Sequence, residues 1–268
     1  MTARIYKLSW GPVQLLLEWR LALFTAVLFP CLVALGFWQL DRAGEKRDLA
    51  ARHAARSAMV ALSDADLFQA LAGPDATGRA AAALADRRVL VTGTLAPDRY
   101  VLIDNRIMEG RFGYEVVALV AAAEGYIPVN IGWIAGDPAR RSLPDPELQA
   151  GYHSVSGHLY VPQKAPFLLA EQQVPEALPA VVQAYEAAAM GSGLSGLLGA
   201  GVLPAVVRIA PEDSLALRTN WTTVNQSPEK HTGYAVQWFA MAAVLLLAFL
   251  LRSSNVWPLL VGRRHPQP

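Results

Sequence analysis

LALFTAVLFPCLVALGFWQL, from Leu21 to Leu40, is a run of 20 residues without a charge. A second uncharged run, YAVQWFAMAAVLLLAFLL, extends over 18 residues from Tyr234 to Leu251. At about 1.5 Å of rise per residue, helices of these lengths extend roughly 27–30 Å, which is the hydrocarbon thickness of a bilayer. A core helix of a soluble protein is the alternative, but such a helix rarely stays apolar on every face for so long. The sequence therefore predicts two membrane spans.

The first apolar run lacks the features of a cleaved signal peptide. It starts only at residue 21, it is longer than the usual apolar region of a signal, and FWQLDR at its end is a poor cleavage site. We interpret it as an uncleaved anchor with a kink at Pro30. The composition agrees, because 53% of residues are hydrophobic and only 17% are charged.

Two spans place both chain ends on one side of the membrane. We expect residues 1–20 and 252–268 to be cytoplasmic tails, because both carry basic residues. Residues 41–233 then form an extracytoplasmic domain, although basic residues also follow the first span directly. No Ser-rich, acid-free leader is recognisable, which favours a bacterial inner membrane with a periplasmic domain over the alternative, a mitochondrial inner membrane.

Cysteine content and charge exclude several classes of function. Cys31 is the only cysteine and lies inside the first apolar run, so no intramolecular disulfide or paired-thiol site can form. The formal net charge of +1 gives no signature of nucleic-acid binding. The sequence contains no HExxH zinc motif, no Cys/His cluster and no GxSxG nucleophile motif.

The middle of the chain is rich in β-branched and aromatic residues, punctuated by Gly, Pro, Asp and Asn. The predicted strands are Arg88–Leu95, Tyr100–Arg106, Tyr114–Ala121, Gly125–Ile134 and Val155–Val161, with Val206–Ile209 and Leu215–Thr223 as candidate closing strands. This spacing is typical of a small antiparallel sheet or open barrel. The predicted fold class is an α+β membrane protein, with two transmembrane helices flanking a β-rich extracytoplasmic domain.

Helices are predicted at the edges of this domain. Asp41–Ala61 is rich in helix formers and continues the first span, and Ser63–Ala72 is a short helix capped by its first serine or the aspartate after it. Gly73–Gly78 is expected to be a loop and Pro175–Met190 a helix. GSGLSGLLGAG, from Gly191 to Gly201, contains GxGxxG but lacks a preceding strand, so we expect a flexible loop rather than a dinucleotide site.

Of the five histidines, His231 is the strongest candidate for a ligand. His153 and His158 are an odd number of residues apart and face opposite sides of a strand, so a structural zinc site is not expected. On a helix, His231, Tyr234 and Trp238 fall within about 60° of one face. An aromatic belt with an exposed cap histidine is one interpretation. The other is a neutral imidazole that binds a planar apolar molecule such as haem, with rings packed on its face and arginines near its propionates.

The end of the first span has a similar character. Trp38 and Arg42 lie four residues apart on one helical face, and Gln39 is adjacent to Trp38. If the two spans pair, both aromatic ends meet at the same membrane surface. That juxtaposition would make a shared site.

Four motifs resemble those of the Surfeit locus protein one (Shy) family of cytochrome c oxidase assembly factors. They are LGFWQLDRAGEK (Gly36, Trp38, Gln39, Arg42, Lys46), LIDNRIMEGRFGYEVV (Asn105, Arg106, Gly110, Gly113, Tyr114), PVNIGWI (Val129, Asn130, Gly132, Trp133) and KHTGYAVQWFAMA (His231, Tyr234, Ala235, Trp238, Phe239). Their order and spacing cover nearly the whole chain. One departure is Ile131, where the family usually has an arginine.

The resemblance implies a role in maturing the haem–copper oxidase by helping haem A reach its catalytic subunit. It further implies that His231 is the axial metal ligand and that Tyr234, Trp238, Trp38 and Arg42 are cofactor-binding residues. Arg106 and Trp133 are expected to hold the outer domain together. Implied partners are the oxidase catalytic subunit, haem A synthase and the lipid bilayer. No enzymatic activity is expected.

Two other hypotheses remain open from the sequence. The first is a membrane scaffold that stabilises an oxidase assembly intermediate without binding haem. The second is an enzyme or a copper chaperone, for which the sequence offers no paired thiols, no Met-His cluster and no recognisable nucleophile.

Overall fold

The computed structural model describes residues 5–10, 13–71, 79–162, 174–221, 227–255 and 257. The chain divides into two compact units, one formed by residues 1–51 with 224–268 and the other by residues 52–223. The loop predicted between Gly73 and Gly78 lies outside the described residues.

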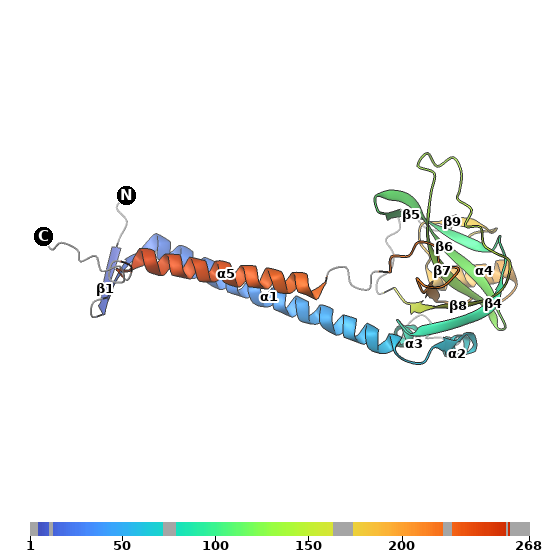
Figure 1. Cartoon of the computed structure of the whole chain (residues 1–268), viewed down its shortest axis with the longest axis horizontal. Coiled ribbons are helices and arrows are strands. Elements are labelled where there is room, and N and C mark those ends of the chain that lie inside the picture. The colour runs from blue at the N-terminus through green and yellow to red at the C-terminus, as the bar shows by residue number, and fades with distance from the viewer. Residues whose placement is uncertain are drawn as a thin grey trace. The chain divides into compact units, whose positions relative to one another are not determined.

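Two long helices dominate the first unit. Helix α1 spans Trp19–Ser57 and helix α5 spans Pro228–Ser253, and they lie side by side (Figure 1). Both contain the predicted spans, and both are long and apolar enough to cross a membrane by length and composition. Only 17% and 11% of their most apolar segments are buried, so most of this apolar surface is left for lipid to cover. With 39 residues, α1 extends about 58 Å, which confirms the predicted continuation beyond Leu40.

The two helices pair antiparallel through a narrow seam. The buried positions are Thr25, Leu32, Gly36 and Ala43 on α1 and Ala235, Ala242 and Ser253 on α5. They recur at intervals of four, seven and eleven residues, which keeps one stripe of each helix against its partner. Most of these residues are small, as is usual where membrane helices approach closely.

A hairpin precedes α1, in the segment predicted to be a tail. Strands β1 (Ile5–Trp10) and β2 (Val13–Glu18) pair antiparallel. The backbone N–H of Gln14 donates to Asn255 Oδ1 at 2.7 Å, and the N–H of Asn255 donates to the carbonyl of Gln14 at 3.1 Å. These bonds join β2 to the residues after α5. The turn signal of Gly11-Pro12 in the sequence could have predicted the hairpin.

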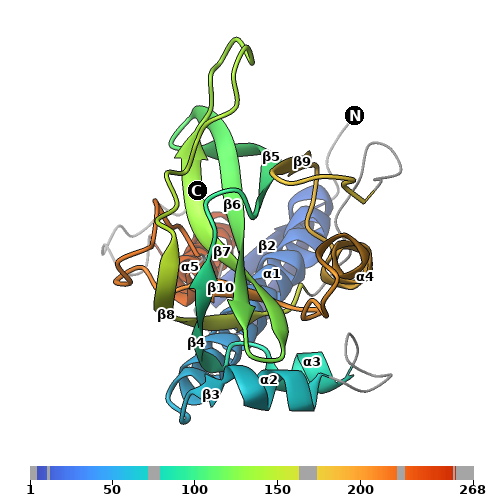
Figure 2. The same cartoon turned by 90° about the vertical axis from the view of Figure 1, so that its right-hand side faces the viewer.

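The second unit is built on an eight-stranded sheet, which faces the viewer in Figure 2. Its strands are β3 (Leu62–Ser63), β4 (Arg88–Leu95), β5 (Tyr100–Met108), β6 (Arg111–Ala122), β7 (Gly125–Ala135), β8 (Gly151–Tyr160), β9 (Ala180–Val182) and β10 (Val206–Ile209). Five of them form a barrel in the order β4-β8-β10-β7-β6, closed by the pairing of Thr94 on β4 with Ala121 on β6. The predicted fold class is confirmed. Within the ring, β10 and β7 run parallel and the other pairs antiparallel.

Two apolar clusters fill the second unit. The barrel interior is covered at one side by helices α2 (Asp64–Ala70) and α3 (Arg79–Leu84). The second cluster joins the outer face of β5 and β6 to helix α4 (Ala187–Leu198). Because β6 is buried on both faces, it carries the run VVALVAA rather than an alternating pattern. Helix α2 begins at the predicted cap, since the Ser63 hydroxyl accepts from the N–H of Asp66.

Three predictions for the segments between residues 175 and 223 were wrong. Pro175–Met190 is not one helix, because Pro179 cannot continue a helix and the residues after it form β9, paired with β5. Gly191–Gly201 is not a flexible loop, because α4 continues to Leu198. Leu215–Thr223 is not a closing strand, since in its described part only Arg218 makes a bridge, to Trp133.

Gly193 of α4 has a packing role, whereas Gly196 has nothing within 4 Å of its Cβ position. A Cβ on Gly193 would lie 2.1 Å from a methyl group of Val174, so only glycine allows this contact. Gly199, with φ of 65°, ends the helix in the left-handed conformation. Gly191, Gly193 and Gly196 lie inside a helix, which is not the strand–turn–helix context of a dinucleotide site.

Candidate functional site

One hydrogen bond joins the first turn of α5 to the facing turn of α1. His231 Nδ1 lies 2.8 Å from Gln39 Oε1, and both side chains are partly buried. A carboxamide oxygen only accepts, so Nδ1 must donate. In the neutral imidazole, Nε2 then carries the free lone pair. The bond therefore leaves His231 able to bind a metal through Nε2.

This bond lies where the apolar surface of both helices ends. Gln39 is next to the last residue of the first uncharged run, and His231 precedes the second run by three residues. Asp41 and Arg42 follow on α1, and Glu229 and Lys230 precede on α5. In a membrane, the pair would lie at the boundary between hydrocarbon and water.

The other predicted residues on α5 lie close to His231 in the helix. Tyr234 has 49% of its surface exposed, and Trp238 is half-buried. Their rings are therefore accessible from outside the helix pair. Both rings have the size and polarity of residues that anchor a helix at the membrane interface.

Trp38 and Arg42 form a separate exposed group on α1. The guanidinium of Arg42 lies 5.8 Å from the Trp38 ring centroid, and its Nη1 lies 2.7 Å from Glu45 Oε2. Trp38 is 48% exposed. Among the described residues, no hydrogen bond, ion pair or ring contact joins either side chain to His231. The structure brings His231 to Gln39 instead.

Close packing of the helices supports this arrangement. A Cβ on Gly36 would lie 2.6–2.9 Å from ring atoms of Phe239. That ring also meets Phe37 edge to face, with centroids 5.3 Å apart and planes at 77°. Gly36 and Gln39 are three residues apart on α1, so the Phe239 contact and the His231 bond fall on the same seam.

Gln39 was absent from the predicted binding set, although it belongs to one of the motifs. A signal was present in the sequence. Gly36, Gln39 and Ala43 follow each other at intervals of three and four residues, as the buried stripe of a helix pair does. Trp38 and Arg42 are out of phase with that stripe.

The middle motifs have structural roles in the barrel. Trp133 is 3% exposed and its indole N–H donates to the carbonyl of Arg106 at 2.8 Å, which ties β7 to β5. Asn130 Nδ2 donates to Glu115 Oε2 at 2.7 Å, and Asn130 Oδ1 accepts from the N–H of Gly132 at 3.1 Å. These bonds hold a bulge between β6 and β7. The prediction that Arg106 and Trp133 hold the domain together is confirmed.

The side chain of Ile131 suits this bulge. Ile131 is 1% exposed and belongs to the barrel core. Where the family usually has an arginine, this chain therefore has an apolar residue of the barrel core.

Histidines in the second unit do not form a metal centre. His53 and His158 have ring centroids 6.1 Å apart, and His53 Nε2 lies 3.9 Å from Asp86 Oδ1. In the part of the chain that the structure describes, no group of three or more His, Cys, Asp or Glu is placed to hold a metal ion. A single imidazole suits an axial ligand of haem, whose iron has its other ligands in the macrocycle.

The family model described as the SURF1 family matches residues 26–243, which include most of each long helix and the whole barrel. The chain belongs to the SURF1 family. A comparison with curated proteins gave no significant match. The SURF1 family is a membrane-associated family known for cytochrome c oxidase assembly, and it is not a known class of enzymes. Family membership therefore assigns the chain to oxidase assembly.

Proposed function

We propose that this SURF1-family chain binds haem A transiently at the membrane surface and hands it to the catalytic subunit of the oxidase. The observation that carries the proposal is the bond between Gln39 and His231, since it leaves Nε2 of a neutral imidazole free at the end of the helix pair. Hydrogen bonds of this kind fix the ring orientation and tautomer of metal-ligating histidines in other proteins. His231 is the proposed axial ligand.

Neighbouring side chains would hold the rest of the molecule. The exposed ring of Tyr234 and the half-buried ring of Trp238 offer apolar surface for a macrocycle and would exclude water from it. Trp38 and Arg42 supply a second aromatic ring and a cation for a propionate. Haem A, once bound, would supply an iron that accepts the imidazole nitrogen. A single protein ligand on an open surface favours release over permanent retention.

The proposed location and partners follow from this role. The two helices would cross a bacterial inner membrane, with the barrel in the periplasm. Haem A synthase is the proposed donor and the oxidase catalytic subunit the acceptor. A mitochondrial inner membrane would give the same arrangement relative to the oxidase.

A haem-free scaffold is the second candidate. The close seam at Gly36 and Phe239 favours it, because a rigid helix pair with a large outer domain can stabilise a partner without a cofactor. Under this alternative, His231→Ala leaves oxidase yield intact, whereas Gly36→Leu lowers it by separating the helices.

The deciding measurement is the absorption spectrum of the detergent-purified chain, produced in cells that make haem A. We expect a Soret band in the parent that is lost or shifted in His231→Ala. Gln39→Leu should keep haem but weaken its binding by about tenfold, as loss of an outer-shell partner does for other metals. His153→Ala, which changes a histidine on β8, is the matched control and should bind as the parent does.

Three results separate the candidates. A parent without haem in repeated preparations contradicts the handover proposal and leaves the scaffold. Identical spectra of the parent and His231→Ala mean that haem binds through another residue. Loss of both haem and oxidase yield in His231→Ala supports handover over the scaffold.

A further inference from the structure

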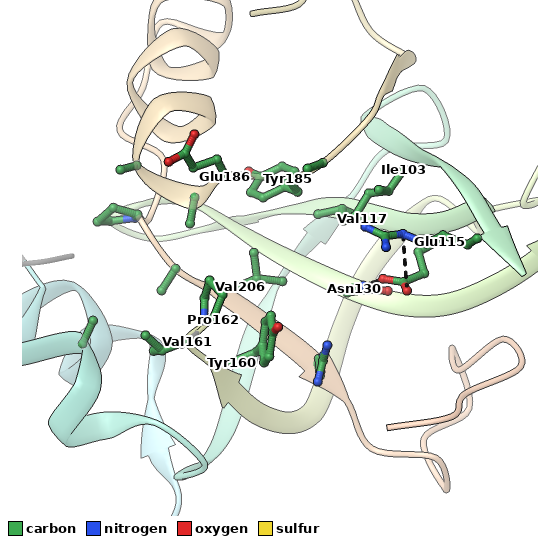
Figure 3. A pocket seen from close by; sticks show the side chains of 18 residues that line it. Ile103, Glu115, Val117, Asn130, Tyr160, Val161, Pro162, Tyr185, Glu186 and Val206 are labelled. Atoms are coloured by element: carbon green, nitrogen blue, oxygen red, sulfur yellow. Dashed lines mark hydrogen bonds and ion pairs between the residues drawn. The ribbon is translucent and has the colours of Figure 1, made fainter. Parts of the chain in front are cut away.

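A cavity of about 540 Å³ lies in the second unit, between the strands of the barrel and the start of α4 (Figure 3). One part of its wall is apolar and includes Ile103, Val117, Val161 and Val206. Another part is polar and includes Arg208, Tyr185 and Glu115. This volume and this mixture are typical of sites for small organic ligands.

Arg208 is a cation without a carboxylate partner. Its guanidinium carbon lies 3.4 Å from the Tyr160 ring centroid and 4.9 Å from that of Trp221. None of the ion pairs among the described residues includes it, and its Nε is buried without a hydrogen-bond partner. Burial lowers the pKa of Arg208, while the Tyr160 hydroxyl and the carboxylate of Glu115 act in the opposite direction.

The second arginine of the wall is engaged. Arg106 Nε lies 3.7 Å from Glu115 Oε1, and Glu115 Oε2 also accepts from Asn130. Figure 3 shows Glu115 and Asn130 together at one side of the cavity. Arg208 is therefore the cation that remains available to a ligand.

Two further groups at the cavity favour an anion. The hydroxyl of Tyr185 is buried and has no hydrogen-bond partner. The first residues of α4, Ala187 and Ala188, line the cavity, and the first N–H groups of a helix have no acceptor within the helix. These N–H groups and the helix dipole attract negative charge. Each feature offers a donor, and none offers a metal ligand.

Charge balance among the described lining residues favours a ligand with a single negative charge. The lining residues include two arginines, Arg106 and Arg208, and two glutamates, Glu115 and Glu186. A ligand with two negative charges could pair with Arg208 but would be repelled by the carboxylates of Glu115 and Glu186. The described lining contains no histidine, cysteine or methionine, which distinguishes this cavity from the proposed haem site.

We propose that this cavity binds a small carboxylic acid with an apolar body, such as a medium-chain fatty acid. The carboxylate pairs with Arg208, and the body packs against the apolar wall. The site is independent of haem binding at His231.

Isothermal titration calorimetry of the full chain in phosphatidylcholine nanodiscs tests the site, with sodium octanoate as the probe and empty nanodiscs subtracted. We expect one saturable site per chain, with a Kd of about 0.1–1 mM for a ligand of this size. Octan-1-ol has the same chain without the charge, and acetate has the charge without the chain. Both should bind at least about tenfold more weakly, because each lacks half of the interactions.

Variants assign the binding to the proposed groups. Arg208→Gln should weaken octanoate binding by about tenfold or more. Arg218→Gln is the matched control, because Arg218 also stacks on a tryptophan but lies outside this cavity, and it should bind as the parent does. His231→Ala should bind octanoate unchanged.

The proposal is overturned if the parent shows no saturable octanoate site, if octan-1-ol binds equally well, or if Arg208→Gln binds as the parent does. Should Arg208→Gln fail to fold, the comparison of octanoate with octan-1-ol on the parent decides.

Discussion

Individual residues in this protein act through the partner that fixes their chemical state. His231 has two ring nitrogens, and the amide oxygen of Gln39 decides which of them carries the proton. The same histidine without Gln39 would exchange between two tautomers and rotate more freely. The proposed ligand function therefore depends on a residue of the other helix.

His158 on β8 gives the second unit a predicted dependence on pH. Burial lowers its pKa below the usual value of 6.5, and the nearby His53 and Arg88 lower it further. Asp86 and Glu212 act in the opposite direction. The unfolded chain therefore binds this proton more readily than the folded chain, so stability is lost as the pH falls below about 6.5. Urea unfolding followed by tryptophan fluorescence at pH 7.5 and 5.5 should show this loss.

Two variants test the assignment to His158. His158→Gln should lose less stability between these pH values than the parent does. Arg88→Gln keeps the histidine and removes one repelling charge, so its loss should be intermediate. An unchanged pH dependence in His158→Gln would show that another group is responsible.

At the scale of the elements, the helix pair depends on small residues in phase with each other. Gly36 allows the Phe239 ring to approach the backbone of α1, and Ala43 and Ala235 are almost completely buried. Dispersion forces and packing drive the association of such helices in lipid, where the hydrophobic effect is absent. An added methyl group at a buried position of this interface is therefore expected to weaken the association of the two helices markedly.

Gly36→Ala should loosen the pair although alanine favours helices. Its Cβ would overlap the Phe239 ring, and such overpacking costs about 1–3 kcal/mol. We expect the Tm of the purified chain to fall by about 2–10 °C, followed by far-UV circular dichroism. Gly44→Ala is the matched control, because nothing lies within 4 Å of its Cβ on the same helix. An equal fall in both variants would contradict the packing argument.

The whole second unit depends on the closure of its barrel. Strands β4 and β6 come from separate parts of the sheet and meet at Thr94 and Ala121. Gly93 lies beside this junction, and a Cβ there would lie 2.4 Å from the carbonyl oxygen of Ala121. Any side chain at residue 93 forces the two strands apart.

Gly93→Ala should therefore destabilise the unit by about 1–3 kcal/mol. Urea unfolding followed by circular dichroism should show a lower midpoint with an unchanged slope. Gly201→Ala, where nothing lies within 4 Å of the Cβ, should stay within about 0.5 kcal/mol of the parent. A Gly93→Ala protein as stable as the parent would mean that the barrel does not need this close contact.

The sequence by itself determined the long-range plan of the protein. Two uncharged runs predict α1 and α5, and β-branched segments predict most barrel strands, because apolar length and residue period act locally. His231 was singled out by the helical face that it shares with Tyr234 and Trp238 and by its family motif. Its role as a ligand stays a prediction. Arg106 and Trp133 were correctly expected to stabilise the domain.

Only the tertiary structure decided the features that need a partner distant in sequence. The glycine-rich segment of α4 resembles a loop in sequence, but it is helical and packs Gly193 against Val174. Pro175–Met190 resembles a helix in sequence, but β9 within it pairs with β5. Gln39 becomes a functional candidate only when α5 lies beside α1. Arg208 becomes an available cation only when the fold engages Arg106 with Glu115. In each case a contact between distant segments outweighs local propensity, which differs by only about 1 kcal/mol per residue for glycine.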